Sequence, residues 1–301
     1  MSSLQIRESQ RWRETQLTYD GALWSFSKYT HAVIRKGHSL VVQLCAQIAR
    51  DLGYRPTILD IGCGWTELYE KLQHITGTYI GVEPSVGQLM RAESRPNQYL
   101  IRGVGEKIML RDSCVDIVLH IADLDHCYDA EKVIAETFRV LKPGGHTIIL
   151  LENRGRFSND IRRLIKMEIS HGEEHLYYFN VDDIRSLVEP YGKIKFLRSY
   201  GFMLGFDAVS KVLPEKIIEG LRSVSDGLMG FSFPKKGQHF IVSATKDMGS
   251  DPASLGFLCS NCGASFEWKE KQCLECHHEF KWMRENILDI LHEETPQVHS
   301  T

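Results

Sequence analysis

The sequence predicts an α/β fold built on a doubly wound, mainly parallel sheet, followed by a small separate C-terminal module. Between residues 39 and 153, apolar strand patterns alternate with amphipathic helix patterns, as in repeated βαβ units. The first of these strands runs directly into a glycine-rich turn. Near the end of the chain, four cysteines are packed into eighteen residues, which sets this region apart from the rest.

Composition narrows the class of protein. The chain has 301 residues, is 43% hydrophobic and 25% charged, and carries a formal net charge of −3. These values are typical of a folded globular protein, and the slightly acidic balance argues against a nucleic-acid partner. No apolar run approaches the roughly 20 residues of a membrane span, and the polar N-terminus does not resemble a signal peptide. We therefore expect a cytoplasmic protein with no membrane contact.

The expected elements follow from periodicity and from helix-ending residues. In the core we expect helices at 39–53, 67–74, 85–94 and 130–141, and strands at 57–61, 78–83, 97–102, 115–121 and 146–153. Beyond Asn153 the pattern loosens. There we expect helices at 159–169 and 181–189 and strands at 193–202 and 238–246, around a mixed segment at 205–236.

The first strand ends in a turn that suits ligand binding. Glycines permit a close approach of backbone to ligand, and ligands of parallel sheets lie beyond the carboxyl ends of the strands. An acidic residue ending the next strand can accept hydrogen bonds from both hydroxyls of a ribose. The residues concerned are Asp60, Gly62, Cys63 and Gly64 in the turn, and Glu83 and Pro84 after the second strand. They indicate an adenosine-containing cofactor, and the alternative is a tight turn without a ligand.

The same turn argues against a dinucleotide. A nicotinamide or flavin site favours a third glycine, which brings a helix N-terminus up to the pyrophosphate. Here Thr66 and Glu67 follow the turn, and the Glu67 carboxylate would repel a pyrophosphate.

Four segments together resemble the class I S-adenosylmethionine-dependent methyltransferases of the small-molecule type. The segments are ILDIGCGWTELYEKL, YIGVEPS, VGEKIMLRDSCVDIVLHIADLDHCYD and RVLKPGGHTIIL, and the resemblance covers roughly residues 55–205. It implies a Rossmann-like methyltransferase fold and methyl transfer from S-adenosylmethionine by direct displacement.

The resemblance also implies roles for individual residues. Asp60 to Gly64 match the loop that wraps the methionine part of the cofactor, and Glu83 matches the ribose-binding acid. Gly105 and Glu106 match the stretch beside adenine, and Ile121, Ala122 and Asp123 match the wall between cofactor and acceptor. Two residues depart from the family pattern: Thr66 replaces a common third glycine, and Val104 replaces an Asp that reaches the adenine amino group.

Acid–base candidates follow the fourth strand and precede the last crossover helix. Methyl transfer needs alignment of the acceptor with the methyl donor and, for some acceptors, removal of a proton. The candidates are Asp125, His126 and His175. Histidine titrates near working pH, which favours His126, whereas the alternative is that Asp125 and His126 only cap the following loop.

A basic segment allows two interpretations. Residues 154–166 contain Arg154, Arg156, Arg162, Arg163 and Lys166 with one acidic residue, Asp160. A solvated helix face explains this pattern. The alternative is recognition of an anionic acceptor, because guanidinium groups bind carboxylate and phosphate with paired donors.

The cysteine cluster predicts a zinc ribbon. Cys259 and Cys262 form one C-x2-C knuckle, and Cys273 and Cys276 form a second, ten residues later. Two such knuckles complete a tetrahedral structural zinc site. Acidic residues outnumber basic ones in this region, which favours a packing or protein-contact role over phosphate binding.

The sequence therefore predicts a methyltransferase that acts on a small molecule or biosynthetic intermediate. Alternatives are an RNA or protein methyltransferase that uses the ribbon for recognition, and a non-catalytic cofactor-binding scaffold. We expect an N-terminal arm or lid over 1–38, a methyltransferase domain over 39–247 with insertions at 154–178 and 205–236, the ribbon over 256–282 and a tail over 283–301. We also expect cofactor binding to survive loss of the zinc.

Overall fold

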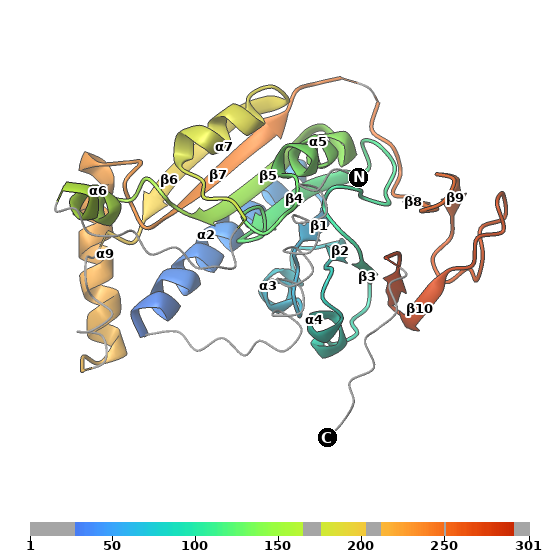
Figure 1. The fold of residues 1–301 in the computed structure, drawn as a ribbon, viewed down its shortest axis with the longest axis horizontal. Coiled ribbons are helices and arrows are strands. Elements are labelled where there is room, and N and C mark those ends of the chain that lie inside the picture. The colour runs from blue at the N-terminus through green and yellow to red at the C-terminus, as the bar shows by residue number, and fades with distance from the viewer. Residues whose placement is uncertain (1–27, 165–175, 203–211, 250, 292–301) are drawn as a thin grey trace, which may run out of the picture.

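The computed structural model describes residues 28–164, 176–202, 212–249 and 251–291. Within these residues, a nine-stranded sheet carries helices on both faces (Figure 1). Its strands are β1 (Thr57–Ile61), β2 (Thr78–Val82), β3 (Gln98–Arg102), β4 (Val115–Ile121), β5 (Leu141–Glu152), β6 (Gly192–Tyr200), β7 (His239–Lys246), β10 (Lys281–Arg284) and β11 (Ile287–Asp289).

The order of the strands is β10-β11-β3-β2-β1-β4-β5-β7-β6. The pairings among β1 to β5 are parallel, whereas β7 runs antiparallel to both β5 and β6. The chain builds outward from β1 in one direction and from β4 in the other. The predicted doubly wound, mainly parallel sheet is thus confirmed, and its switch point lies between β1 and β4.

Two apolar cores separate the helices into layers. One face of the sheet packs on α5 (Ala130–Val140) and α7 (Val181–Val188). The opposite face packs on α2 (Lys28–Leu52), α3 (Glu67–Leu72), α4 (Val86–Arg91) and α9 (Glu215–Ser232). The remaining helix of the described chain, α6 (Phe157–Leu164), follows β5.

The largest differences from the expected elements concern helices. α2 begins at Lys28 rather than near residue 39, because Tyr29, Ala32 and Val33 continue the buried stripe of the helix toward its N-terminus. Part of the expected arm over 1–38 is therefore core helix, and residues 1–27 lie outside the described residues. α9 occupies the segment expected to be mixed, where its glycines weaken the helical signal.

The end of the chain also differs from expectation. The ribbon region forms the hairpin β8 (Phe257–Leu258) and β9 (Ser265–Phe266). Residues 281–289, expected to end the ribbon and begin a tail, instead form β10 and β11 of the main sheet. β11 runs parallel to β3, with Leu100 N donating to Asn286 O at 2.9 Å and Ile290 N donating to Arg102 O at 3.1 Å.

No helix in the described part of the chain is both long and apolar enough to cross a lipid bilayer.

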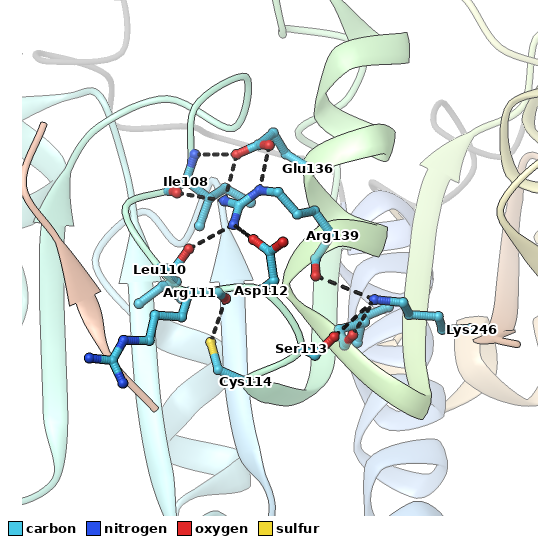
Figure 2. A network of polar contacts seen from close by, with 10 residues as sticks. Ile108, Leu110, Arg111, Asp112, Ser113, Cys114, Glu136, Arg139 and Lys246 are labelled. Carbon is cyan, nitrogen blue, oxygen red and sulfur yellow. Dashed lines mark hydrogen bonds and ion pairs between the residues drawn. The ribbon is translucent and has the colours of Figure 1, made fainter. Parts of the chain in front are cut away.

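A polar cluster centred on Arg139 of α5 fastens the loop after β3 (Figure 2). The guanidinium group donates to Leu110 O and Ile108 O, both at 2.8 Å, and forms ion pairs with Asp112 and Glu136. Glu136 in turn accepts from Ile108 N at 2.9 Å. Because loops carry few internal hydrogen bonds, this cluster supplies partners for three backbone groups of the loop, the N–H and C=O of Ile108 and the C=O of Leu110.

We expect Arg139→Met to lower the free energy of unfolding by about 2–4 kcal/mol, because it leaves buried carbonyls and Glu136 without their charged donor. Urea denaturation measures the change. The matched control is Arg185→Met, at an exposed residue that pairs with Glu189 at 3.4 Å, and should change stability by less than about 0.5 kcal/mol. Equal effects of the two substitutions would contradict a structural role for the cluster.

Candidate functional site

A cavity of about 370 Å³ opens at the carboxyl ends of β1, β2 and β4, on the switch point of the sheet. Its walls come from α2, from the loops after β1, β2, β3 and β4, and from the start of α3. The lining residues used below are Ile34, His38, Asp60, Gly62, Cys63, Gly64, Trp65, Glu67, Glu83, Pro84, Val104, Gly105, Glu106, Ile121, Ala122, Asp123, His126 and Cys127.

The turn after β1 uses backbone conformations that favour glycine. Gly62 has φ 69° and Gly64 has φ 51°. A Cβ at Gly62 would lie 2.6 Å from the Cβ of Asp123, whereas a Cβ at Gly64 would meet nothing within 4 Å. Gly62 is therefore needed for packing between the loops after β1 and β4, while Gly64 leaves its side open.

Two other residues of this region adopt the left-handed conformation without being glycine. Thr66, before α3, has φ 68°, and Ala122, directly after β4, has φ 55°. The conformation of Thr66 explains the third glycine of related sequences, since glycine adopts it without strain. Strained backbone at two sides of one cavity is typical of a binding site.

Glu83 ties the first two strand ends together. Its Oε2 accepts from Gly64 N at 3.0 Å, and its Oε1 accepts from Ser85 N at 2.8 Å. The carboxylate is buried, with 7% of the residue exposed. Glu83 thus holds the glycine turn in place in addition to facing the cavity.

Asp60 carries an unusual charge state. Burial raises the pKa of its carboxyl to about 7, and the nearby Asp123 and Glu83 carboxylates act in the same direction. The hydroxyl of Tyr79 donates to Asp60 Oδ2 at 2.6 Å and opposes this rise. Asp60 is therefore partly protonated at neutral pH and becomes a full anion only when a cation or a higher pH favours it.

A fully buried histidine positions Asp123. Thr137 Oγ1 donates to Val133 O at 2.9 Å, so it accepts from His120 Nε2 at 2.8 Å. His120 Nδ1 lies 2.7 Å from Asp123 Oδ2, and this contact fixes the orientation of the Asp123 carboxyl group. Asp123 Oδ1 is buried and has no hydrogen-bond partner in the described structure, so it is available to a ligand donor.

All eleven residues predicted for cofactor binding line this one cavity. They come from four separate loops, which the parallel sheet brings to one edge. Their individual roles toward a ligand remain predictions.

The three candidate acid–base residues differ in their position relative to the cavity. His126 lines the cavity, with 15% of its side chain exposed. Asp125 is buried beside it, 3.9 Å from His126 Nε2, but does not line the cavity. Its backbone oxygen accepts from Leu176 N and Tyr177 N. His175 lies outside the described residues.

His38 is a cavity residue that the sequence did not single out. Its Nδ1 lies 3.0 Å from Lys71 Nζ, and burial together with the Lys71 charge lowers the pKa of its imidazole. A neutral imidazole is thus favoured beside the cavity. Ile34 and His38 lie one helical turn apart on α2, so their spacing could have indicated a shared face.

Among the described residues of the basic segment, none lines this cavity. Arg154 lies at a separate surface hollow with Lys235 and Lys236, and Arg156 pairs with Glu152. Neither arginine lines the main cavity. The side chains of Arg162, Arg163 and Lys166 lie outside the described part of the structure.

The four ribbon cysteines form a cluster that could hold a zinc ion. Their sulfur atoms all lie within 4.8 Å of one another. The Cys259–Cys276 sulfurs are 3.7 Å apart and the Cys262–Cys273 sulfurs 3.6 Å apart. Four sulfurs at about 2.3 Å from a tetrahedral zinc ion lie about 3.8 Å from each other, so the cluster fits this metal.

The ribbon is joined to the cavity loops on two sides. Phe257 forms a β-bridge with Leu110, and Lys107 Nζ donates to Ser260 O at 2.9 Å. Leu110 and Lys107 belong to the loop after β3, which also contains Gly105 and Glu106. On the other side, Arg102 pairs with the buried Asp289 at 3.2 Å and donates to Pro84 O at 3.3 Å.

Comparisons with known proteins agree with this geometry. Residues 59–149 match a family described as a methyltransferase domain. A probable S-adenosylmethionine-dependent methyltransferase of Mycolicibacterium smegmatis is 28% identical over 102 residues, which is 34% of this chain and 40% of that protein. A ubiquinone biosynthesis O-methyltransferase of Photobacterium profundum is 27% identical over 143 residues, which is 44% of this chain and 61% of that protein.

The fold comparison covers more of the chain. A putative S-adenosylmethionine-dependent methyltransferase of Listeria monocytogenes aligns with 71% of this chain and 99% of its own at 15% identity, with a TM-score of 0.50. The chain spans about half the length of the curated relatives that it matches. The sheet, the glycine turn and these matches together support a class I S-adenosylmethionine-dependent methyltransferase domain in this chain.

The raised pKa of Asp60 predicts a pH-dependent stability. The unfolded chain loses the Asp60 proton near pH 4, whereas the folded protein keeps it until about pH 7. The free energy of unfolding therefore falls as pH rises from about 4 to about 7. The decrease is roughly 2 kcal/mol between pH 5 and 7. Well above pH 7, Asp60 causes no further change in stability.

Urea denaturation of the Asp60→Asn variant from pH 5 to 8 tests this sign. Asparagine keeps an acceptor for Tyr79 but does not titrate, so the stability of the variant relative to the native chain should rise with pH. A constant difference between the two proteins would contradict the assignment.

Proposed function

We propose that the protein transfers a methyl group from S-adenosylmethionine to a small-molecule acceptor bound in the cavity at the switch point. The observation that carries this proposal is the charge of the cavity. Five carboxylates line it, from Asp60, Glu67, Glu83, Glu106 and Asp123, and no lysine or arginine is among its described lining residues. Such a site favours a cofactor with a sulfonium and an ammonium group and disfavours a pyrophosphate.

The chain's own residues fit this cofactor. The open side of Gly64 leaves room for a ligand against the backbone, and the unpartnered Asp123 Oδ1 offers an acceptor to an ammonium group. Glu83 would accept hydrogen bonds from the ribose, and the backbone around Val104 and Gly105 would lie against adenine. The cofactor supplies the electrophilic methyl carbon, and the protein aligns the acceptor with it.

The elements that form the cavity walls indicate the size of the acceptor. No described residue beyond Cys127 lines the cavity, so the ribbon does not contribute to it. This favours a small molecule over RNA or protein recognised through the ribbon. The names of relatives that are O-methyltransferases of ubiquinone biosynthesis support an acceptor hydroxyl, from which His126 would remove the proton. The acidic walls argue against an anionic acceptor. Methyl transfer to a small molecule fits a cytoplasmic enzyme.

Isotope transfer tests the proposal. The protein is incubated with methyl-labelled S-adenosylmethionine and a cell extract, and labelled products are sorted by mass into small molecules, RNA and protein. We expect a labelled small molecule. Label found only in RNA or protein would show that the acceptor is a macromolecule and not a small molecule. Cofactor binding with no acceptor-dependent turnover would support a scaffold instead.

Once the acceptor has been identified, we expect His126→Ala to lower kcat by roughly 10²-fold or more, which is the usual contribution of a general base. Affinity for S-adenosylmethionine, measured by calorimetry, should change by less than about threefold. Glu83→Gln should instead weaken cofactor binding by about 1.5–3 kcal/mol. The control His74→Ala replaces an exposed histidine away from the cavity and should leave both constants unchanged. An unchanged kcat in His126→Ala would remove the base from the mechanism.

We further propose that the four cysteines bind a structural zinc ion whose removal also affects the cofactor site. A ribbon of this size cannot bury a self-sufficient core, so the metal supplies much of its folding energy. Its loss would release β11 from β3 and leave Arg102 without Asp289. The structure thus gives a reason to revise the expectation, drawn from the sequence, that cofactor binding survives zinc loss.

We expect chelation, or Cys273→Ser, to weaken binding of S-adenosylmethionine by roughly tenfold, which corresponds to about 1.4 kcal/mol. Asp289→Asn should retain the zinc, measured by elemental analysis, and cause part of the same loss. Full cofactor affinity after metal removal and unfolding of the ribbon would show that the two parts are independent. Protein purified without chelator but free of zinc would refute the metal site.

A further inference from the structure

His38 of α2 is held in one tautomer by a lysine of α3. Lys71 Nζ lies 3.0 Å from His38 Nδ1. An ammonium group only donates hydrogen bonds, so Nδ1 accepts and carries no proton. The single proton of the neutral ring therefore lies on Nε2. Burial and the Lys71 charge, which both lower the pKa of this imidazole, favour the same neutral state.

The Nε2–H group of His38 is a hydrogen-bond donor at the cavity wall. Among the described residues, the hydrogen bond with Lys71 is the one that the His38 ring makes. The histidine lines the cavity at the strand ends, with 14% of its side chain exposed. An Nε2–H group at this wall can donate to a ligand oxygen, whereas Nδ1, occupied by Lys71, cannot take a proton from a substrate.

Close packing of α2 on the sheet fixes the position of His38. A Cβ at the preceding residue, Gly37, would lie 2.7 Å from Leu150 Cδ1 and would also overlap the hydroxyl oxygen of Tyr200. Leu150 belongs to β5 and Tyr200 to β6, so the backbone of α2 lies directly against the sheet at this point. The donor is therefore placed by packed secondary structure rather than by a loop.

The glycine turn after β1 has few donors left for a ligand. Four of the five amides in residues 62–66 already donate hydrogen bonds within the protein, at 2.8 to 3.3 Å. They belong to Gly62, Cys63, Gly64 and Thr66. In the described structure the amide of Trp65 has no such partner. An anionic group bound against this turn therefore needs a donor from another element.

The carboxylate of S-adenosylmethionine is such a group. The five carboxylates of the cavity favour the sulfonium and ammonium groups of the cofactor but repel its carboxylate. An ammonium group at Asp123 Oδ1 would put the amino-acid end of the cofactor beside Gly62, because these two residues pack together. His38 lies at the same turn, since its partner Lys71 belongs to α3, which begins directly after the turn.

We propose that His38 binds the carboxylate of S-adenosylmethionine through its Nε2–H group, with Lys71 fixing the tautomer. This inference rests on the proposed function and adds the residue that recognises the anionic end of the cofactor. A hydrogen bond into Nδ1 polarises the ring and strengthens Nε2–H as a donor. Lys71 also neutralises Glu67, whose carboxylate lies 3.9 Å from His38 Nδ1 and accepts from Lys71 at 3.2 Å.

Binding of two ligands tests the proposal. Calorimetry compares S-adenosylmethionine with its decarboxylated form, which keeps the sulfonium and ammonium groups. His38→Leu should weaken binding of S-adenosylmethionine by roughly tenfold or more and of the decarboxylated form by less than about threefold, because one hydrogen bond to a charged group is lost. His38→Gln, whose side-chain amide can donate in place of Nε2, should retain most of the affinity. Circular dichroism checks that both variants fold.

Nitrogen NMR of the native chain, with isotope-labelled histidines, tests the tautomer directly. We expect a neutral His38 ring with its proton on Nε2, identified by the loss of its signals in His38→Gln. Lys71→Met should release this preference and weaken binding of S-adenosylmethionine. The control Lys193→Met, at an exposed lysine of β6 that pairs with Asp247 at 3.2 Å, should change neither.

Two results would overturn the inference and leave the proposed function standing. One is a proton on Nδ1 of His38 in the native chain. The other is an equal change in affinity for both ligands in His38→Leu. A native chain that binds neither ligand would overturn the proposed function together with this inference, so the two failures are distinguishable.

Discussion

The site depends on one constraint, the convergence of parallel strand ends at the switch point of the sheet. β1, β2 and β4 all end at the same edge, so the loops that follow them must share the space between α2 and α3. Glu83 accepts one hydrogen bond from Gly64 and one from Ser85, and these two bonds fix the position of the loop after β1 relative to the loop after β2. The absence of a side chain at Gly62 is the local consequence of this crowding, because a Cβ there would lie 2.6 Å from the Cβ of Asp123.

The same convergence concentrates negative charge. Asp60, Glu83 and Asp123 are each less than a tenth exposed, and together they raise the free energy of any fully ionised state. The protein relieves this at Asp60, whose raised pKa keeps its proton to near neutral pH, and it places the His120 imidazole 2.7 Å from Asp123 Oδ2. A cationic cofactor would complete the neutralisation. This electrostatic argument, rather than the glycine turn alone, separates a sulfonium donor from a dinucleotide.

Sequence reasoning found the parts of this arrangement that depend on local pattern. Strand periodicity, the turn glycines and the acid after β2 were sufficient to predict the sheet and the cavity residues of the first two loops. The resemblance to methyltransferases was needed for the other five, which are Gly105, Glu106, Ile121, Ala122 and Asp123. His38 was missed because its role arises only when α2 packs beside α3 and brings Lys71 to 3.0 Å. β11 was missed because three residues carry too little periodicity, and its pairing with β3 is a contact between segments distant in sequence.

The position of β11 changes how the cysteine cluster relates to the rest of the molecule. A ribbon attached only by a linker would fold and unfold without effect on the sheet. Here β11 covers the edge of β3, Tyr99 of β3 stacks edge-on against Trp268 at 5.0 Å, and Arg102 links Asp289 to the backbone at Pro84. Edge strands expose unpaired backbone groups, and covering this one satisfies them. The ribbon, β11 and the loop beside Glu83 are therefore connected by a continuous set of packing and polar contacts. Through these contacts, a segment far in sequence from the cavity supports the strand whose end carries one of the cavity loops.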